Sequence, residues 1–446
     1  MKLIGTNGMK KKIAFYLGNK NHPSIDFSHP EQGNPGVGYS DYLPVALVHY
    51  LTNRYGDDYE YYLLAEEVSN LPTNILHFRV LDINDAAQKA ADINADIFVF
   101  RTRINEEDRI LSTIDRLNLK SIGIAQLTPT PKHIKKLAKS KSLMALVCVG
   151  KEQYDFLIDT KLSNKLTVIN NAIDTSLYKP LDKAERNTKL VTYMGALTTQ
   201  KGFHVLAEAW PSILEQHPDA KLSVIGSTKL YDDKSNLGRF GVSDKEYEQK
   251  YITRYLTDKR GDLLKSVTLH GQMGIDKLDI LRKSIIGVAN PTGDTETCCV
   301  SAVEMSASGI AVVSGAFYAL LNTVKHKQTG LLGDTTKDLV KNICSLLDNP
   351  VMAIKLGVNG QKYAQNEFSF DQILPQWMNL FDVVLGNKKI PTPSGYKNLL
   401  KHLKFLRIIN MIFQRSFGRY MFWPSIYETQ WLLKDLYLKI KKRKNK

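Results

Sequence analysis

The chain has 446 residues, of which 43% are hydrophobic and 24% charged, and its formal net charge is +15. This length predicts two domains rather than one core, and the four cysteines lack metal-ligand spacing, which excludes a disulfide framework or a zinc knuckle. The apolar run at residues 13–17, after three consecutive lysines, is too short for the core of a signal peptide. We therefore expect a cytoplasmic protein whose cysteines stay reduced.

The N-terminal part, residues 1–180, alternates short β-branched or aromatic runs with amphipathic stretches. Such alternation is typical of βα units around a parallel sheet and predicts a Rossmann-like first domain. Strands are predicted at residues 12–17, 61–65, 97–101, 121–125, 145–149 and 166–169, and helices at 39–55 and 132–140. The polar segment 179–189 then indicates a linker.

The alternation restarts in residues 181–386, which predicts a second Rossmann-like domain. Strands are predicted at residues 190–194, 221–225, 267–270, 285–289 and 310–314, and helices at 203–216, 277–283, 297–308, 337–347 and 352–367. The polar residues 227–236 are expected to form a solvated loop. We expect an α/β fold of two parallel-sheet domains that face each other across a cleft, with ligands at the C-terminal ends of the strands.

Residues 387–446 form a basic C-terminal extension. From Lys397 onward there are thirteen Lys or Arg and two acidic residues, which places +11 of the net charge here. Apolar residues recur at helical spacing, at Leu399, Leu403, Leu406, Ile409 and Phe413. A basic amphipathic helix of this kind, followed by the closing run KIKKRKNK, predicts contact with an anionic membrane surface. The alternatives are that the helix packs on the first domain, or that the cationic extension meets nucleic acid.

The segment ETCCVSAVE sets Glu296 eight residues before Glu304. If residues 297–308 are helical, the offset is about 12 Å at about 1.5 Å per residue. The two carboxylates of glycoside hydrolases are closer, roughly 5 to 9.5 Å apart around one bond. The spacing therefore favours two carboxylates that hold separate ends of a long ligand such as a nucleotide sugar, although an arbitrary pair of glutamates is more often solvated or capping.

Gly195, at the end of a predicted strand, leads into Lys201 and Gly202 at the start of the next helix. Lys201 can project into the cleft, and Gly202 would let the backbone approach a phosphate. The N-terminus of the helix after Glu296 adds amide donors and roughly half a positive charge. Together these features predict a clamp for a departing diphosphate.

In this order the motifs resemble the retaining family 4 glycosyltransferases of the GT-B fold, also known as glycosyl transferases group 1. The resemblance covers about residues 10–385 and is carried by the glutamate pair and by ASGIAVVSG, TGLL, GALTTQKGFHVLAEA, LHGQM and VINNAIDTSLYKP. It implies two Rossmann-like domains and transfer of a sugar from a UDP- or GDP-type donor, with neither a metal nor another cofactor. It also implies retention of anomeric configuration by a front-face route, in which the leaving phosphate helps to deprotonate the acceptor.

The resemblance also implies roles for individual residues. Glu296 would hold the donor-sugar hydroxyls and Lys201 the diphosphate, as the catalytic residues, and Glu304 would bind the ribose. The other donor-side residues implied are Gly195, Gly202, Gly271, Gln272, Thr297, Cys298, Cys299 and Val300. The loop GNPGVG at residues 33–38 would close over the phosphates and the acceptor through Gly36, Val37 and Gly38.

The sequence departs from the family pattern at two places. Ala196 stands where the family usually has an arginine, so Lys201 would carry more of the phosphate charge. The histidine that often follows a strand of the first domain is absent from AQLTPTP, so Gln126 or Thr128 would contact the sugar instead.

The leading hypothesis is an enzyme at the inner face of the plasma membrane that extends a lipid-linked or growing polysaccharide acceptor in cell-surface glycan biosynthesis. One rival is a GT-B glucosyltransferase that modifies nucleic acid. The other is a catalytically silent relative that acts as an adaptor or glycan-binding subunit.

Overall fold

The computed structural model describes residues 10–103, 107–180, 182, 185–231, 235–292, 296–391, 393, 399–417 and 424–444. Within the helices, it does not describe the side chains of residues 107, 108, 415, 417 and 441–444.

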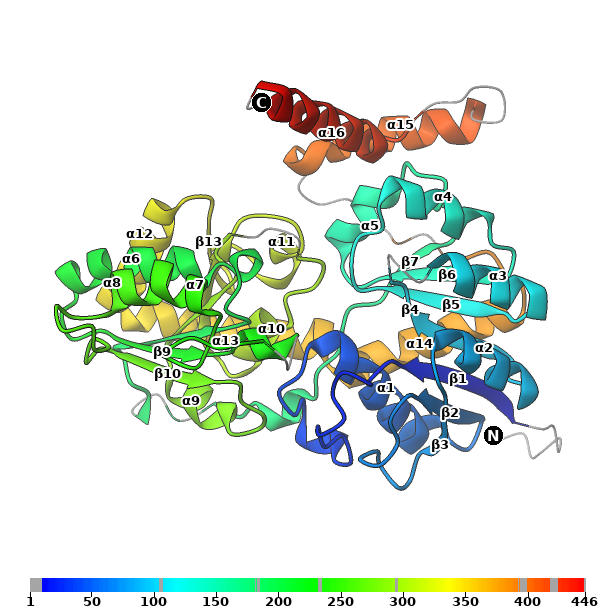
Figure 1. The fold of residues 1–446 in the computed structure, drawn as a ribbon, viewed down its shortest axis with the longest axis horizontal. Coiled ribbons are helices and arrows are strands. Elements are labelled where there is room, and N and C mark those ends of the chain that lie inside the picture. The colour runs from blue at the N-terminus through cyan, green and yellow to red at the C-terminus, as the bar shows by residue number, and fades with distance from the viewer. Residues whose placement is uncertain are drawn as a thin grey trace.

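Two all-parallel sheets form the body of the molecule (Figure 1). The first has the strand order β3-β2-β1-β4-β5-β6-β7. Its strands are β1 (Lys11–Leu17), β2 (Tyr59–Ala65), β3 (Leu76–Arg79), β4 (Ile97–Arg101), β5 (Ser121–Ala125), β6 (Leu143–Cys148) and β7 (Leu166–Val168). Its helices are α1 (Tyr39–Tyr55), α2 (Ile83–Asp92), α3 (Glu107–Leu117), α4 (Pro131–Lys139) and α5 (Lys151–Leu157).

The second sheet has the order β10-β9-β8-β11-β12-β13, which repeats the doubly wound arrangement of the first. Its strands are β8 (Leu190–Met194), β9 (Lys221–Ile225), β10 (Val267–Gly271), β11 (Ile286–Ala289), β12 (Ala311–Gly315) and β13 (Gly330–Gly333). Its helices include α6 (Phe203–Gln216), α7 (Lys245–Tyr247), α8 (Arg254–Leu256), α9 (Lys277–Lys283), α10 (Val300–Ala307), α11 (Leu320–Thr323), α12 (Thr336–Asp348) and α13 (Pro350–Phe368). The expected α/β fold of two Rossmann-like domains is confirmed.

The helix expected at residues 297–308 begins later, at Val300. The preceding residues are held in another conformation, because the Thr297 hydroxyl donates to the carbonyl of Gln126 in the first domain at 2.7 Å. Glu296 therefore lies in a loop, and the 12 Å offset expected along one helix does not apply to this glutamate pair.

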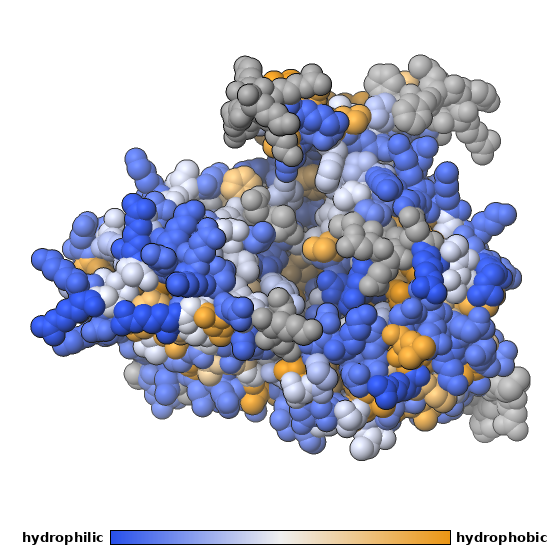
Figure 2. Space-filling view, viewed as in Figure 1, coloured by the Kyte–Doolittle hydropathy of each residue, from blue (hydrophilic) through white to orange (hydrophobic). Residues whose placement is uncertain are grey.

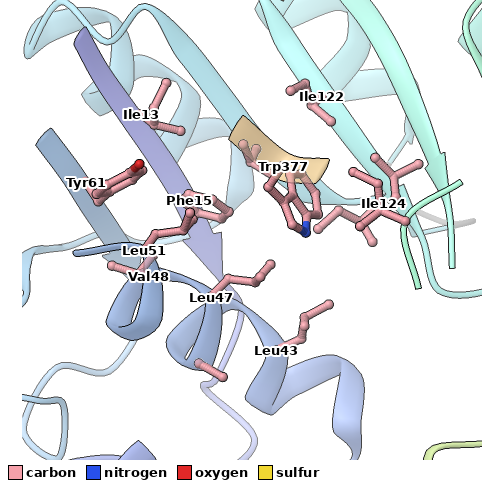
Figure 3. Close-up of a cluster of buried hydrophobic side chains, with 14 of the residues drawn as sticks. Ile13, Phe15, Leu43, Leu47, Val48, Leu51, Tyr61, Ile122, Ile124 and Trp377 are labelled. Carbon is pink, nitrogen blue, oxygen red and sulfur yellow. The ribbon is translucent and has the colours of Figure 1, made fainter. Parts of the chain in front are cut away.

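A core beneath the first sheet joins the start of the chain to its last third. Phe15 of β1 packs against Leu47 of α1 and against Trp377, whose ring centroid is 6.4 Å from that of Phe15 (Figure 3). Trp377 belongs to α14 (Phe370–Leu385), which crosses back from the second domain. The expected second domain runs to residue 386, but the structure places α14 in the core of the first.

The C-terminal extension folds into two further helices, α15 (Lys404–Phe417), preceded by a 3-10 turn at Lys401–Leu403, and α16 (Ile426–Lys444). They lie above α4 and α5 at the top of Figure 1 and contact both. Of the closing KIKKRKNK run, the described side chains end at Ile440. Within the described residues no helix combines the length and the apolar character needed to cross a bilayer.

The inner side of α15 is held by buried charges. The Lys404 ammonium lies 2.6 Å from the Glu152 carboxylate and 3.1 Å from that of Asp155. Arg407 donates to the carbonyl of Phe156 at 3.0 Å and lies 3.7 Å from Asp159. The extension therefore packs on the first domain, which was one of the two alternatives to membrane contact.

We predict that Lys404→Met detaches α15 from α5. The substitution leaves the buried Glu152 without the ammonium it bonds, while Asp155 keeps its pair with Lys151, and breaking a buried pair in this way costs about 3–5 kcal/mol. Hydrogen exchange of the α15 amides should accelerate strongly while the amides of both sheets stay protected.

The matched control is Lys439→Met, which removes an exposed pair with Asp435 at 2.7 Å. Such surface pairs contribute about 0–1 kcal/mol. Unchanged exchange of α15 in the Lys404 variant would contradict the assigned role.

Candidate functional site

The C-terminal ends of strands from both sheets border one cavity of about 480 Å³. This volume lies within the range of roughly 300–1,000 Å³ typical of small-molecule sites. Of the residues predicted for the site, those that line it are Glu296, Lys201, Glu304, Gly195, Gln272, Thr297, Cys298, Cys299, Val300, Gly36, Val37 and Gln126. Most of the predicted donor side therefore meets in one place.

Glu296 and Lys201 both line the cavity and form an ion pair with each other. The Lys201 ammonium donates to Glu296 Oε1, and the Asn290 side-chain amide donates to the same oxygen at 2.8 Å. Burial is the largest single influence and disfavours the charge on Lys201, but the facing Glu296 carboxylate together with Tyr231 and Cys299 outweighs it and raises the pKa of the lysine. Lys201 is therefore a permanent cation at neutral pH.

Glu304 lies in α10 and is 5% exposed. Its Oε1 accepts from the Lys277 ammonium at 2.9 Å and from the Tyr178 hydroxyl at 2.7 Å. The second carboxylate of the cavity is thus also balanced by a lysine, and its free lone pairs remain as acceptors for a ligand hydroxyl.

The first domain closes the other side of the cavity. Gln272 donates its side-chain amide to the carbonyl of Gly36. Gly36 has φ +101°, and a Cβ there would lie 2.9 Å from the carbonyl oxygen of Met273. Both the conformation and this close approach between domains require glycine.

Four predicted residues lie outside the lining of this cavity, among the residues that the structure describes. Gly38 is the N-cap of α1, and Thr128 lies beyond the cavity residue Gln126. Gly202 caps α6 with φ +75°, and Gly271 ends β10 with φ +70°. Their neighbours Lys201 and Gln272 line the cavity, so these two glycines shape the turns that present the site.

Several residues of the cavity were not predicted. Lys277 and Asn290 hold the two glutamates, and Arg101 and Asn171 line the side of the first domain. Tyr231, expected in a solvated loop, lines the cavity beside Lys201, which bonds its hydroxyl. Arg101 ends β4 and Asn290 follows β11, and polar residues at strand ends could have been predicted as cavity residues. Nothing in the sequence indicates that Lys277 pairs with Glu304.

Residues 177–363 match the family model described as glycosyl transferases group 1. The match covers most of the second domain and less than half of the chain. Across 249 residues the chain is 27% identical to D-inositol 3-phosphate glycosyltransferase of Corynebacterium aurimucosum. The aligned region covers 52% of this chain and 53% of that protein. The chain thus spans about half the length of this curated relative.

The whole molecule resembles solved glycosyltransferase structures. Sucrose-phosphate synthase of Thermosynechococcus elongatus superposes with a TM-score of 0.67 at 16% identity, over 85% of this chain and all of that one. Anabaena HepE in complex with UDP and glucose superposes with a TM-score of 0.58 at 14% identity, over 83% of this chain and 99% of that one. The two-domain architecture is the GT-B fold.

The two vicinal cysteines of the second domain precede α10. Burial raises the pKa of Cys298 and of Cys299 to about 12 each. A helix N-terminus can lower a thiol pKa, but desolvation dominates here. Both thiols are therefore protonated at neutral pH and serve as small packing groups against the cavity.

We predict that iodoacetamide modifies Cys298 and Cys299 roughly a thousandfold more slowly than glutathione at pH 8, because so little thiolate is present. Peptide mass spectrometry over time measures the two rates, with Cys298→Ser and Cys299→Ser to assign them. A rate that levels off near neutral pH would show that one of the thiols has a low pKa.

Proposed function

We propose that the protein is a retaining glycosyltransferase that moves a sugar from a UDP- or GDP-type donor to a lipid-linked or growing polysaccharide acceptor. The observation that carries the proposal is the pair of buried carboxylates, Glu296 and Glu304, each balanced by a lysine and both facing one cavity between the domains. The UDP and UDP-glucose complexes of Anabaena HepE support a nucleotide-sugar donor.

The paired charges suggest how the donor binds. The diphosphate would approach Lys201, while sugar hydroxyls would replace the ammonium as donors to Glu296. Val300 and Ser301 at the start of α10 line the same cavity, so the positive end of this helix would add to the potential there. The departing phosphate would thus be stabilised by fixed protein groups rather than by a metal ion.

Retention follows in this proposal from a front-face route. The acceptor hydroxyl would enter on the side from which the nucleoside diphosphate leaves, and the leaving phosphate oxygen would take its proton. Glu304 would hold the ribose hydroxyls. Gln126, which lines the cavity and bonds Asn171, would contact the sugar.

Location belongs to the same proposal. The extension, which carries +11 of the net charge from Lys397 onward, would hold the enzyme at the inner face of the plasma membrane. Salt-sensitive binding to DNA together with failure to bind anionic vesicles would favour the nucleic-acid rival instead.

We predict that the purified protein releases free nucleoside diphosphate from one member of a panel of UDP- and GDP-sugars. Lys201→Ala should lower this turnover by roughly a hundredfold or more, because loss of one preorganised donor at developing charge costs about 2.7–4 kcal/mol. Lys355→Ala, an exposed lysine of the same domain, is the matched control.

Turnover near the wild-type rate in the Lys201 variant would remove this lysine from the site. Isothermal titration that detects binding of no nucleoside diphosphate, combined with no turnover of any donor, would favour the silent relative.

A further inference from the structure

Helix α15 buries two charged side chains and exposes most of its apolar ones, whereas an amphipathic helix usually does the opposite. Lys404 and Arg407, at most 1% exposed, face the first domain. The opposite side carries apolar side chains that are between 37% and 57% exposed, namely Phe405, Leu406, Ile409, Ile412 and Phe413. The spacing places them on one stripe, and orange residues mark the hairpin of α15 and α16 at the top of Figure 2.

Helix α16 continues this surface. Its first residues dock, with Tyr427 buried against the first domain, but every residue from Trp431 to Ile440 is exposed. One face of this exposed stretch is apolar, formed by residues between 47% and 66% exposed, namely Leu432, Leu433, Leu436, Tyr437 and Ile440. Monomeric soluble proteins rarely leave so much contiguous apolar surface in water without using it.

Charge decides which partner fits this surface. The exposed lysines Lys401, Lys434 and Lys439 belong to the same extension, whose sequence from Lys397 onward carries a net charge of +11. Apolar stripes with basic flanks match the acyl and headgroup layers of an anionic bilayer. A second copy of this chain would place these charges against each other.

The turn before α15 also reaches the second domain. The ring of His402 stacks on Tyr318, with centroids 4.9 Å apart and planes 10° apart, and its Nε2 accepts from the Tyr318 amide at 3.3 Å. Lys401 lies 3.9 Å from Asp334. The extension is therefore a strap that holds both domains.

The strap ends next to the donor-binding loop. Ala319, which follows Tyr318, donates its amide to the carbonyl of Glu296 at 3.3 Å. On the other side, Gly150 at the start of α5 approaches Thr297 so closely that a Cβ would lie 2.5 Å from its carbonyl oxygen. A displacement of the strap thus acts on the backbone that carries Glu296.

We propose that the outer face of the α15–α16 hairpin docks on an anionic bilayer and that the contact of His402 with Tyr318 transmits docking to the Glu296 loop. The catalytic part of this inference rests on the proposed transferase function. His402 and Tyr318 are positioning residues, and bilayer docking favours the donor-binding arrangement of the cleft.

The docking surface is tested by flotation of the full chain with vesicles of phosphatidylglycerol and phosphatidylcholine in equal parts, and with phosphatidylcholine alone. We expect flotation with the anionic vesicles only, reduced by high salt, and at least a tenfold loss in the double variant Leu406→Asp, Ile409→Asp. The matched control is Leu81→Asp, Val351→Asp, which alters two apolar residues elsewhere that are even more exposed.

Equal flotation of the two double variants would overturn the surface. A stable wild-type dimer that the Leu406, Ile409 variant converts to monomer, without flotation of either, would assign the surface to a second copy of the chain.

The strap is tested with Tyr318→Ala, Asp334→Ala, which removes the ring stacking with His402 and the ion pair with Lys401 from the side of the second domain and leaves the extension intact. This variant should float like the wild type. Anionic vesicles should lower the donor KM of the wild type several-fold and leave that of the variant unchanged. An equal decrease of the donor KM in both proteins would contradict the proposed role of the strap.

A structural readout separates this inference from the proposed function. Vesicles should slow hydrogen exchange in the peptide that contains Tyr318 and Ala319 in the wild type and leave it unchanged in the strap variant. This measurement needs no turnover, so absence of activity in all proteins would count against the transferase alone. Unchanged exchange in the wild type with bound vesicles would overturn the coupling.

Discussion

A charged side chain taken out of water must be paired, and this constraint organises both the cavity and the extension. Four buried acids or acid clusters in the described structure meet a lysine or arginine that is distant in sequence. They are Glu296 with Lys201, Glu304 with Lys277, Glu152 and Asp155 with Lys404, and Asp159 with Arg407. The first two border the cavity, and the others attach the extension.

The pairs differ in how a ligand could reach them. The Lys201 side chain is 27% exposed and faces the cavity, so an incoming anion can compete for it. The Lys404 side chain is 1% exposed and closed off by two carboxylates. An incoming ligand can therefore displace the lysine–carboxylate pair at the cleft, whereas the lysine–carboxylate pairs under α15 are closed to ligands.

The sequence predicted the repeating parts of the fold well, because alternation of apolar runs reports directly on parallel strands buried on both faces. The eleven predicted strands were found near their expected bounds, whereas two edge strands were not predicted, β3, half exposed at Leu76, and the short β13. Contacts between segments that are distant in the sequence could not be predicted from it. The bond from Thr297 to Gln126, which delays α10, and the partnership of Lys277 with Glu304 depend on how the two domains close.

The extension shows why a periodic pattern alone does not say which face of a helix is buried. The stripe from Leu403 to Phe413 predicted an amphipathic helix, and the usual expectation is that such a stripe faces a core. Here the deciding feature lies elsewhere, in the acids Glu152, Asp155 and Asp159 of the α5 region, which recur at helical spacing and are at most 4% exposed. Without the extension Glu152 and Asp159 would lose the cations that pair with them, and Asp155 would keep Lys151. The extension is consequently part of the fold rather than a detachable tether, and a force applied to its apolar face is felt by both domains.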